Sequence, residues 1–153
     1  LINMEYVNFI SLSYENKNLI KKAFEAAEHS VSQNSHKVGC AILCSDGKIF
    51  TGATNIRSRV IGTTCAERMA IDQLYYHGNK EPILCALVGL LTRKQWTKSS
   101  IITPCGVCLE MFWEVIMSLK IKDINFICSS WNKKRILKIK FSELYPRIEG
   151  VNR

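Results

Sequence analysis

The sequence predicts a three-layer α/β fold, in which a five-stranded mixed sheet lies between helices on both of its faces. Apolar runs of strand length alternate with longer segments of helical periodicity. The first two strands are joined by a tight turn at Asp46-Gly47, and two later strands each follow a helical segment. With 153 residues, 47% of them apolar, the chain can bury one core, so we expect a single domain over residues 1–153.

The first half predicts a helix followed by a hairpin. Ser13 is a favourable N-cap for a helix that runs to about Gln33. Its apolar face is formed by Leu19, Ile20, Ala23, Phe24 and Ala27. The segment "VGCAILC", residues 38–44, predicts a buried strand, and residues 49–54 return beside it as the second strand.

The second half predicts two helix-then-strand units and a closing strand. A helix over residues 64–77 ends at Gly78, and the apolar residues 82–91 form a strand buried on both faces. The next helix begins at Pro104 or Cys105 and ends near Leu119. Its predicted core face consists of Leu109, Phe112, Trp113 and Ile116. The last two strands are residues 123–129 and 135–140, and a helical turn follows at residues 141–146.

Charge and hydropathy limit the possible partners. The net charge of +8 fits nucleic acid or an anionic substrate, but its scatter along the chain favours a solvated basic surface. Only residues 132–140 are densely basic, and we interpret them as an edge strand that discourages pairing. No apolar run reaches the roughly 18 residues of a membrane span, and no signal peptide is recognisable. We therefore expect a cytoplasmic protein without a membrane partner.

The seven cysteines divide into two groups. Without a secretory signal, a metal or catalytic role is favoured over a disulfide framework. Four lie in apolar strands and are expected to be small buried hydrophobes: Cys40, Cys44, Cys85 and Cys128. Cys65, Cys105 and Cys108 lie instead where predicted helices begin, and there the helix dipole and free N–H groups stabilise thiolates.

Those three cysteines predict a catalytic Zn²⁺ site. Cys105 and Cys108 form a C-x-x-C pair that can grip one ion from a tight turn, and Cys65 adds a third thiolate. Three protein ligands leave the fourth tetrahedral position open for water, which is the pattern of a catalytic rather than a structural zinc. Soft thiolate ligands favour zinc over magnesium or calcium.

Glu67 is the predicted proton carrier of this site. A carboxylate beside a metal-activated water can move a proton to a substrate nitrogen, although an acidic residue is also common in a first helical turn. The combination of C-x-E with a later P-C-x-x-C is the general motif of zinc deaminases and favours the catalytic role. Arg68 can offset part of the negative charge of three thiolates.

Four motifs together resemble the cytidine deaminase superfamily, specifically its small free-nucleoside branch. They are "VGCAILCSDGKIFTG", "CAERMAI", "TPCGVCLEMF" and "FSELYP", in this order within residues 38–146. The resemblance implies the cytidine-deaminase-like fold and a zinc-dependent hydrolysis that converts the 4-amino group of an aminopyrimidine nucleoside or analogue to 4-oxo, with ammonia release. It also implies a homotetramer that shares its sites between subunits.

The resemblance assigns roles residue by residue. Cys65, Cys105 and Cys108 match the zinc ligands, and Glu67 matches the proton shuttle. Arg68 matches an arginine that hydrogen-bonds the thiolates, and the backbone amide of Ala66 matches the group that holds the pyrimidine 2-oxo oxygen.

The expected substrate-binding positions depart from the family. His36 stands where the family has a phenylalanine; it can line the pocket or be an ordinary surface residue. A gapless alignment puts Thr54 and Ile56 where the family has the Asn and Glu that hold the ribose hydroxyls. A one-residue bulge would instead offer Asn55, with Arg57 in place of the Glu. In both cases the ribose carboxylate is missing.

The missing carboxylate keeps a second substrate class open. The alternative to a cytidine deaminase is a blasticidin S-type or other non-ribosyl aminopyrimidine deaminase, since blasticidin S deaminases also lack that Glu. Arg57 and Arg59 can be solvated loop charges or can contact an anionic group.

Two other function classes are disfavoured. A nucleic-acid editing deaminase needs basic and aromatic surface around its pocket, and this chain is short and begins its ligand set with Cys rather than His. A non-catalytic domain that uses zinc only for stability would have no need of Glu67.

Overall fold

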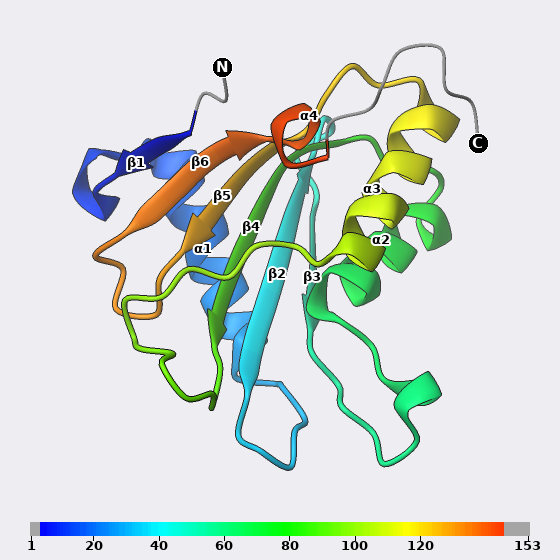
Figure 1. Cartoon of the computed structure of the whole chain (residues 1–153). Helices are drawn as coiled ribbons and strands as arrows, with labels where there is room; N and C mark the ends of the chain where they lie inside the picture. Colours follow the sequence, from blue (N-terminus) through cyan, green and yellow to red (C-terminus); the bar gives the residue numbers. More distant parts are fainter. Residues whose placement is uncertain (1–3, 146–153) are drawn as a thin grey trace.

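The computed structural model describes residues 4–145 and contains, in that range, one six-stranded sheet (Figure 1). The strands lie in the order β1-β6-β5-β4-β2-β3, and β4 and β5 are parallel, whereas every other neighbouring pair described is antiparallel. The strand bounds are β1 (Glu5–Val7), β2 (Lys37–Cys44), β3 (Ile49–Ala53), β4 (Pro82–Leu90), β5 (Asn125–Ser129) and β6 (Ile136–Lys140).

Helices cover the two faces of the sheet, which confirms the predicted three layers. The helices are η1 (Phe9–Ser11), α1 (Tyr14–Ala27), η2 (Val60–Gly62), α2 (Ala66–Tyr76), α3 (Gly106–Leu119) and α4 (Phe141–Leu144). Helix α1 packs on one face through Leu19 and Ile20, while α2 and α3 lie side by side on the other (Figure 1). No helix within residues 4–145 is long and apolar enough to cross a membrane.

The prediction of five strands ending in a basic edge was wrong. β1 pairs with the outer side of β6, with Tyr6 opposite Leu137. The basic side chains of this region contact the N-terminal segment: Arg135 lies 5.3 Å from the Tyr6 ring and Lys133 lies 5.4 Å from the Phe9 ring. Cation–π contacts of this kind stabilise the added strand. The basic side chains therefore bind aromatic rings of the N-terminal segment and do not prevent a further strand from pairing with β6.

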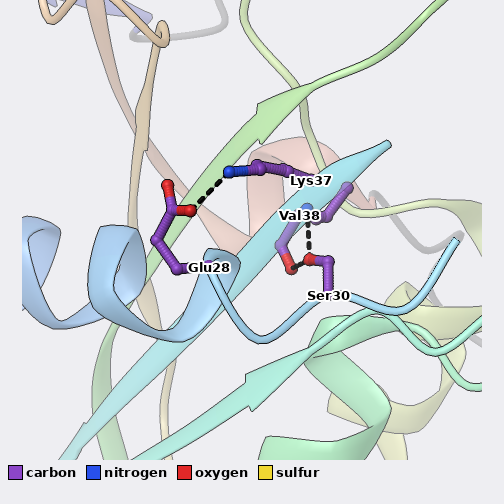
Figure 2. Close-up of polar contacts among 4 residues, drawn as sticks. All are labelled: Glu28, Ser30, Lys37 and Val38. Carbon is purple, nitrogen blue, oxygen red and sulfur yellow. Dashed lines mark hydrogen bonds and ion pairs between the residues drawn. The ribbon is translucent and has the colours of Figure 1, made fainter. Parts of the chain in front are cut away.

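Helix α1 begins as predicted but ends six residues earlier than Gln33. The Ser13 side chain caps the helix by accepting a hydrogen bond from the Asn16 N–H. Ala27 is the last helical residue, and Ser30 then uses its hydroxyl to accept from Val38 N at 3.0 Å and to donate to Val38 O at 3.2 Å. An ion pair between Glu28 and Lys37 lies beside these two hydrogen bonds (Figure 2). Serine side chains that bond the backbone in this way compete with helix continuation.

The other predicted elements are confirmed with small shifts of their bounds. Gly47 has φ +83° in the turn between β2 and β3, and Gly78 has φ +91° directly after α2. The strands predicted to begin at residues 123 and 135 begin at Asn125 and Ile136. The predicted final turn ends at Leu144, and position 146 lies outside the described residues.

The buried side chains follow the predicted pattern with one exchange. The four strand cysteines, Cys40, Cys44, Cys85 and Cys128, are at most 1% exposed, as predicted. On α3, Leu109, Phe112 and Ile116 are buried, but Trp113 is only partly buried and Val115 takes its place in the core. The Phe112 ring meets the Phe126 ring of β5 edge-on at 5.0 Å.

Candidate metal centre and active site

Three thiols converge where α2 and α3 begin. Cys65 is the N-cap of α2, Cys105 is the N-cap of α3, and Cys108 lies in the first turn of α3. Their sulfur atoms all lie within 4.8 Å of one another, and the sulfurs of Cys105 and Cys108 are 3.5 Å apart. Cys108 is buried, whereas Cys105 is exposed. The cluster is therefore open to solvent on one side.

A glycine fixes the position of Cys65 relative to the sheet. A Cβ atom on Gly52 of β3 would lie 2.1 Å from the Ala66 carbonyl oxygen and 2.8 Å from the Ala70 nitrogen. The absence of that atom lets the first turn of α2 rest directly on the strand. The close approach holds Cys65 and Glu67 at a defined height above the sheet.

The neighbouring thiols and Arg68 favour the thiolate form of Cys65. Its pKa is lowered to about 6, mainly because Cys108 donates a hydrogen bond to its sulfur, with further contributions from Cys105 and the positive charge of Arg68. The same interaction raises the pKa of Cys108. Helix N-termini favour the thiolate form at each of these positions.

Glu67 lies in the first turn of α2 and is 5% exposed. Burial raises the pKa of its carboxyl to about 7, and the charge of Cys65 acts in the same direction. The carboxyl also interacts electrostatically with three buried thiols of the sheet, Cys40, Cys85 and Cys128. A carboxyl with a pKa near neutral can both accept and release a proton under physiological conditions.

Arg68 and Ala66 adjoin these groups. Arg68 Nη1 lies 3.5 Å from the Thr63 carbonyl oxygen, and its charge contributes to the lowered pKa of Cys65. Ala66 is the first residue of α2 and is fully buried. The N–H groups of a first helical turn have no partner within the helix, so the Ala66 amide is suited to bind an oxygen atom.

The residues after β3 run beside the segment that precedes Cys65. Thr54 N donates to Val38 O at 3.0 Å, and its hydroxyl donates to Thr64 O at 3.3 Å. Asn55 exchanges two backbone hydrogen bonds of 2.9 Å with Thr64, and Ile56 N donates to the Val31 carbonyl. These hydrogen bonds place Thr54 and Asn55 beside Thr64, the residue directly before Cys65, and Ile56 follows them.

His36 is held by a residue that the sequence did not single out. Its Nδ1 accepts the Thr92 N–H at 2.9 Å, so in the neutral ring Nε2 carries the proton. The Thr92 hydroxyl also donates to the Asn34 carbonyl. Within the described part of the chain, the hydrogen-bond partner of His36 is thus Thr92 and not a residue of the thiol cluster. No local sequence pattern links two residues so far apart.

Arg57 and Arg59 are exposed on the loop between β3 and α2. The Arg57 backbone N–H donates to the Thr63 hydroxyl at 3.2 Å, and its aliphatic stem lies against Gly62. These contacts close the loop at its base.

The donor set fits zinc. Zinc binds thiolate sulfur at about 2.3 Å with tetrahedral geometry, which places two sulfur ligands about 3.8 Å apart. The distances of up to 4.8 Å among the three sulfurs are within a small rearrangement of that value. Three soft sulfur donors and no hard oxygen donor in the group match the preference of this metal.

Comparison with known proteins identifies the family. The family described as "Cytidine and deoxycytidylate deaminase zinc-binding region" matches residues 13–128. A protein named cytidine deaminase from Halalkalibacterium halodurans is 34% identical over 99 residues, which cover 63% of this chain and 69% of that protein. A probable cytidine deaminase from Dictyostelium discoideum is 35% identical over 102 residues, or 62% and 64% of the two chains.

Solved structures show the same fold. The cytidine deaminase of Burkholderia pseudomallei superposes with a TM-score of 0.70 at 24% identity, over 88% of this chain and 98% of its own. That of Mycobacterium leprae gives a TM-score of 0.67 at 20% identity, over 88% and 100%. Together with the family match over the thiol site, these findings show that the chain belongs to the cytidine and deoxycytidylate deaminase family and is a zinc-dependent hydrolase of this type.

Proposed function

We propose that the protein is a hydrolytic deaminase that converts the 4-amino group of an aminopyrimidine nucleoside or analogue to a 4-oxo group and releases ammonia. One observation carries this proposal: the buried carboxyl of Glu67 lies beside three convergent thiols at two helix N-termini. Cys65, Cys105 and Cys108 are the proposed zinc ligands.

Glu67, Ala66 and Arg68 have separate roles in this reaction. Zinc, when bound, supplies a Lewis acid that lowers the pKa of a water molecule to near neutral. Glu67 accepts a proton from the attacking water and delivers it to the ring nitrogen N3, while the water oxygen bonds to C4. Glu67 then moves the remaining proton of that oxygen to the amino nitrogen, so that the C4–N bond breaks, the C4=O bond forms and ammonia leaves. The Ala66 N–H holds the 2-oxo oxygen of the ring, and Arg68 balances part of the thiolate charge.

The exact substrate has two candidates. The names of the relatives favour cytidine. The alternative is a blasticidin S-type or other non-ribosyl aminopyrimidine, and the neutral side chains Thr54 and Ile56 at the end of β3 favour it.

We also propose that the protein is a homo-oligomer, most simply a tetramer, in a reducing compartment such as the cytoplasm. Val107 and Met117 on the outward side of α3 are 57% and 58% exposed. Apolar side chains at such positions are better buried against another subunit. Light scattering that finds only a 17.4 kDa species at micromolar concentration would contradict this part of the proposal.

The function is tested by ammonia release from cytidine, deoxycytidine, cytosine, deoxycytidylate and blasticidin S, together with zinc analysis. Glu67→Gln should keep one zinc per chain and a native circular dichroism spectrum, but should lose at least about a hundredfold in turnover. Glu15→Gln, at the exposed first-turn position of α1 on the other face of the sheet, is the matched control and should retain the activity of the wild type.

Three results would count against the proposal. A Glu67→Gln enzyme with near wild-type turnover would mean that another group moves the proton. A purified protein without zinc would remove the proposed centre. Salt-sensitive binding to single-stranded RNA or DNA, with deamination of the polymer and not of the monomers, would favour an editing enzyme.

A further inference from the structure

The side chains of β3 and of the segment after it that face α2 can be identified from the geometry of the extended chain. We call the surface formed by Gly52, Thr54 and Ile56 the wall. A Cβ atom at Gly52 would meet the backbone of α2, so this position faces the helix that carries Cys65 and Glu67. Side chains alternate between the two faces of a strand. The chain stays extended beyond the end of β3 at Ala53, because Asn55 forms β-bridges with Val31 and Thr64. Thr54 and Ile56 therefore lie on the same face as Gly52, and Asn55 lies on the opposite one.

The register of the hairpin supports this alternation. The pairs from Gly39↔Ala53 to Leu43↔Ile49 follow one another without a shift, and the Thr54 N–H continues the ladder by donating to Val38 O. The backbone of Asn55 is occupied by its two hydrogen bonds to Thr64. The bridges of Asn55 to Val31 and Thr64 continue the extended chain directly after this ladder, which favours the gapless alignment over the one-residue bulge.

The side chains of the wall carry no charge, and their one polar atom, the Thr54 hydroxyl oxygen, already takes part in a hydrogen bond. Thr54 is 8% exposed, and its hydroxyl donates to the Thr64 carbonyl, one residue before Cys65. Ile56 has no polar side-chain atom. A substrate hydroxyl placed against this wall finds no carboxylate or amide acceptor, and a buried hydroxyl without a partner is costly.

We infer that this enzyme does not recognise the hydroxyl groups of a sugar through the end of β3, and that Thr54 and Ile56 are specificity-determining residues. The substrate class that fits the wall is an aminopyrimidine whose N1 substituent is poor in hydroxyls. The inference rests on the proposed deaminase function and restricts it to a narrower class of substrate.

The test compares three nucleosides that differ only in their hydroxyl groups. We expect kcat/KM to be equal within about threefold, or to rise, from cytidine to 2′-deoxycytidine to 2′,3′-dideoxycytidine. A site built to bind a hydroxyl loses about tenfold to a hundredfold when that hydroxyl is removed. This series needs only the wild-type enzyme, so it does not depend on the folding of any variant.

Two variants assign the effect to the wall. Thr54→Asn combined with Ile56→Glu supplies an amide and a carboxylate on the α2 face, and should shift the ratio of kcat/KM by about tenfold or more in favour of cytidine. If the double variant does not fold, Ile56→Glu alone, at a partly exposed position, should shift the ratio in the same direction. Asn55→Ala should leave the ratio as it is in the wild type.

The outcomes separate this inference from the proposed function. A wild-type preference of tenfold or more for cytidine over dideoxycytidine would overturn the inference, and loss of that preference in Asn55→Ala would identify Asn55 as the residue responsible. Folded, zinc-loaded protein that releases no ammonia from any of the three nucleosides, or from cytosine, would overturn the proposed function and the inference together.

Discussion

Replacing Gly52 by alanine is expected to move the start of α2 and so damage the metal centre. The new Cβ would lie 2.1 Å from the Ala66 carbonyl oxygen, whereas ordinary contact begins at 3.4 Å, so the helix must retreat by about 1.3 Å. Both partners are backbone atoms, so no side-chain rotation can relieve the contact. Overpacking of this kind costs about 1–3 kcal/mol of unfolding free energy.

The displacement falls on the residues that matter most for the chemistry. Ala66 lies between Cys65 and Glu67, and a misplacement of about 1 Å in an active site can cost on the order of a hundredfold in rate. We therefore expect Gly52→Ala to lower zinc affinity by about tenfold or more and turnover by about a hundredfold. Competition with a chromophoric chelator measures the first quantity, and ammonia release measures the second.

The chain contains a matched control on the other face of the sheet. A Cβ at Gly39 would lie 1.9 Å from the Ala23 carbonyl oxygen and 2.5 Å from the Ala27 nitrogen, both in α1. Gly39→Ala should lower the urea midpoint about as much as Gly52→Ala, but should keep the zinc affinity of the folded protein. Equal loss of zinc affinity in the two variants, or an unchanged urea midpoint in Gly52→Ala, would refute this reasoning.

Three further predictions concern metal binding and stability. Free zinc at a hundredfold excess over Kd should stabilise the wild type by about 2.7 kcal/mol, which is measured as a rise in Tm. Cys108→Ser should lose most of this rise. Ser30→Ala should cost about 1–3 kcal/mol in urea denaturation because it frees two backbone groups of Val38, whereas Glu28→Gln, which breaks an exposed ion pair, should cost under about 0.5 kcal/mol. Phe112→Ala should cost about 3–5 kcal/mol in the same assay, and a smaller effect than Glu28→Gln would mean that the α3 core is misassigned.

The features that depend only on neighbouring residues could be predicted from the sequence. The turn at Asp46-Gly47, the helix closure at Gly78 and the cap at Ser13 each depend on residues within one turn of one another, and each was predicted correctly. The three helix-start thiols could also be recognised locally, because C-x-x-C and C-x-E are short motifs. Their use as zinc ligands, and the role of Glu67, stay predictions until they are measured.

The errors all involve contacts between distant residues. A three-residue strand has too few positions to show an alternating pattern, so β1 becomes visible only through its partner β6. The end of α1 depends on the contact between Ser30 and Val38, and the place of Trp113 depends on how α3 rotates against the sheet. The Thr92 N–H that bonds His36 follows two residues after the end of β4, and this contact, on which the sequence made no prediction, is also between distant residues.

The pairing of β1 with β6 has a consequence for the order in which the chain folds. Val7 is synthesised 129 residues before Ile136, its partner. The β2–β3 hairpin and the α2–β3 contact can form as soon as they leave the ribosome, because the loops that they close are short. The strand β1 must wait until β6 has been made. Its docking is then a late step that completes the sheet, and until that step the outer edge of β6 is available to other chains.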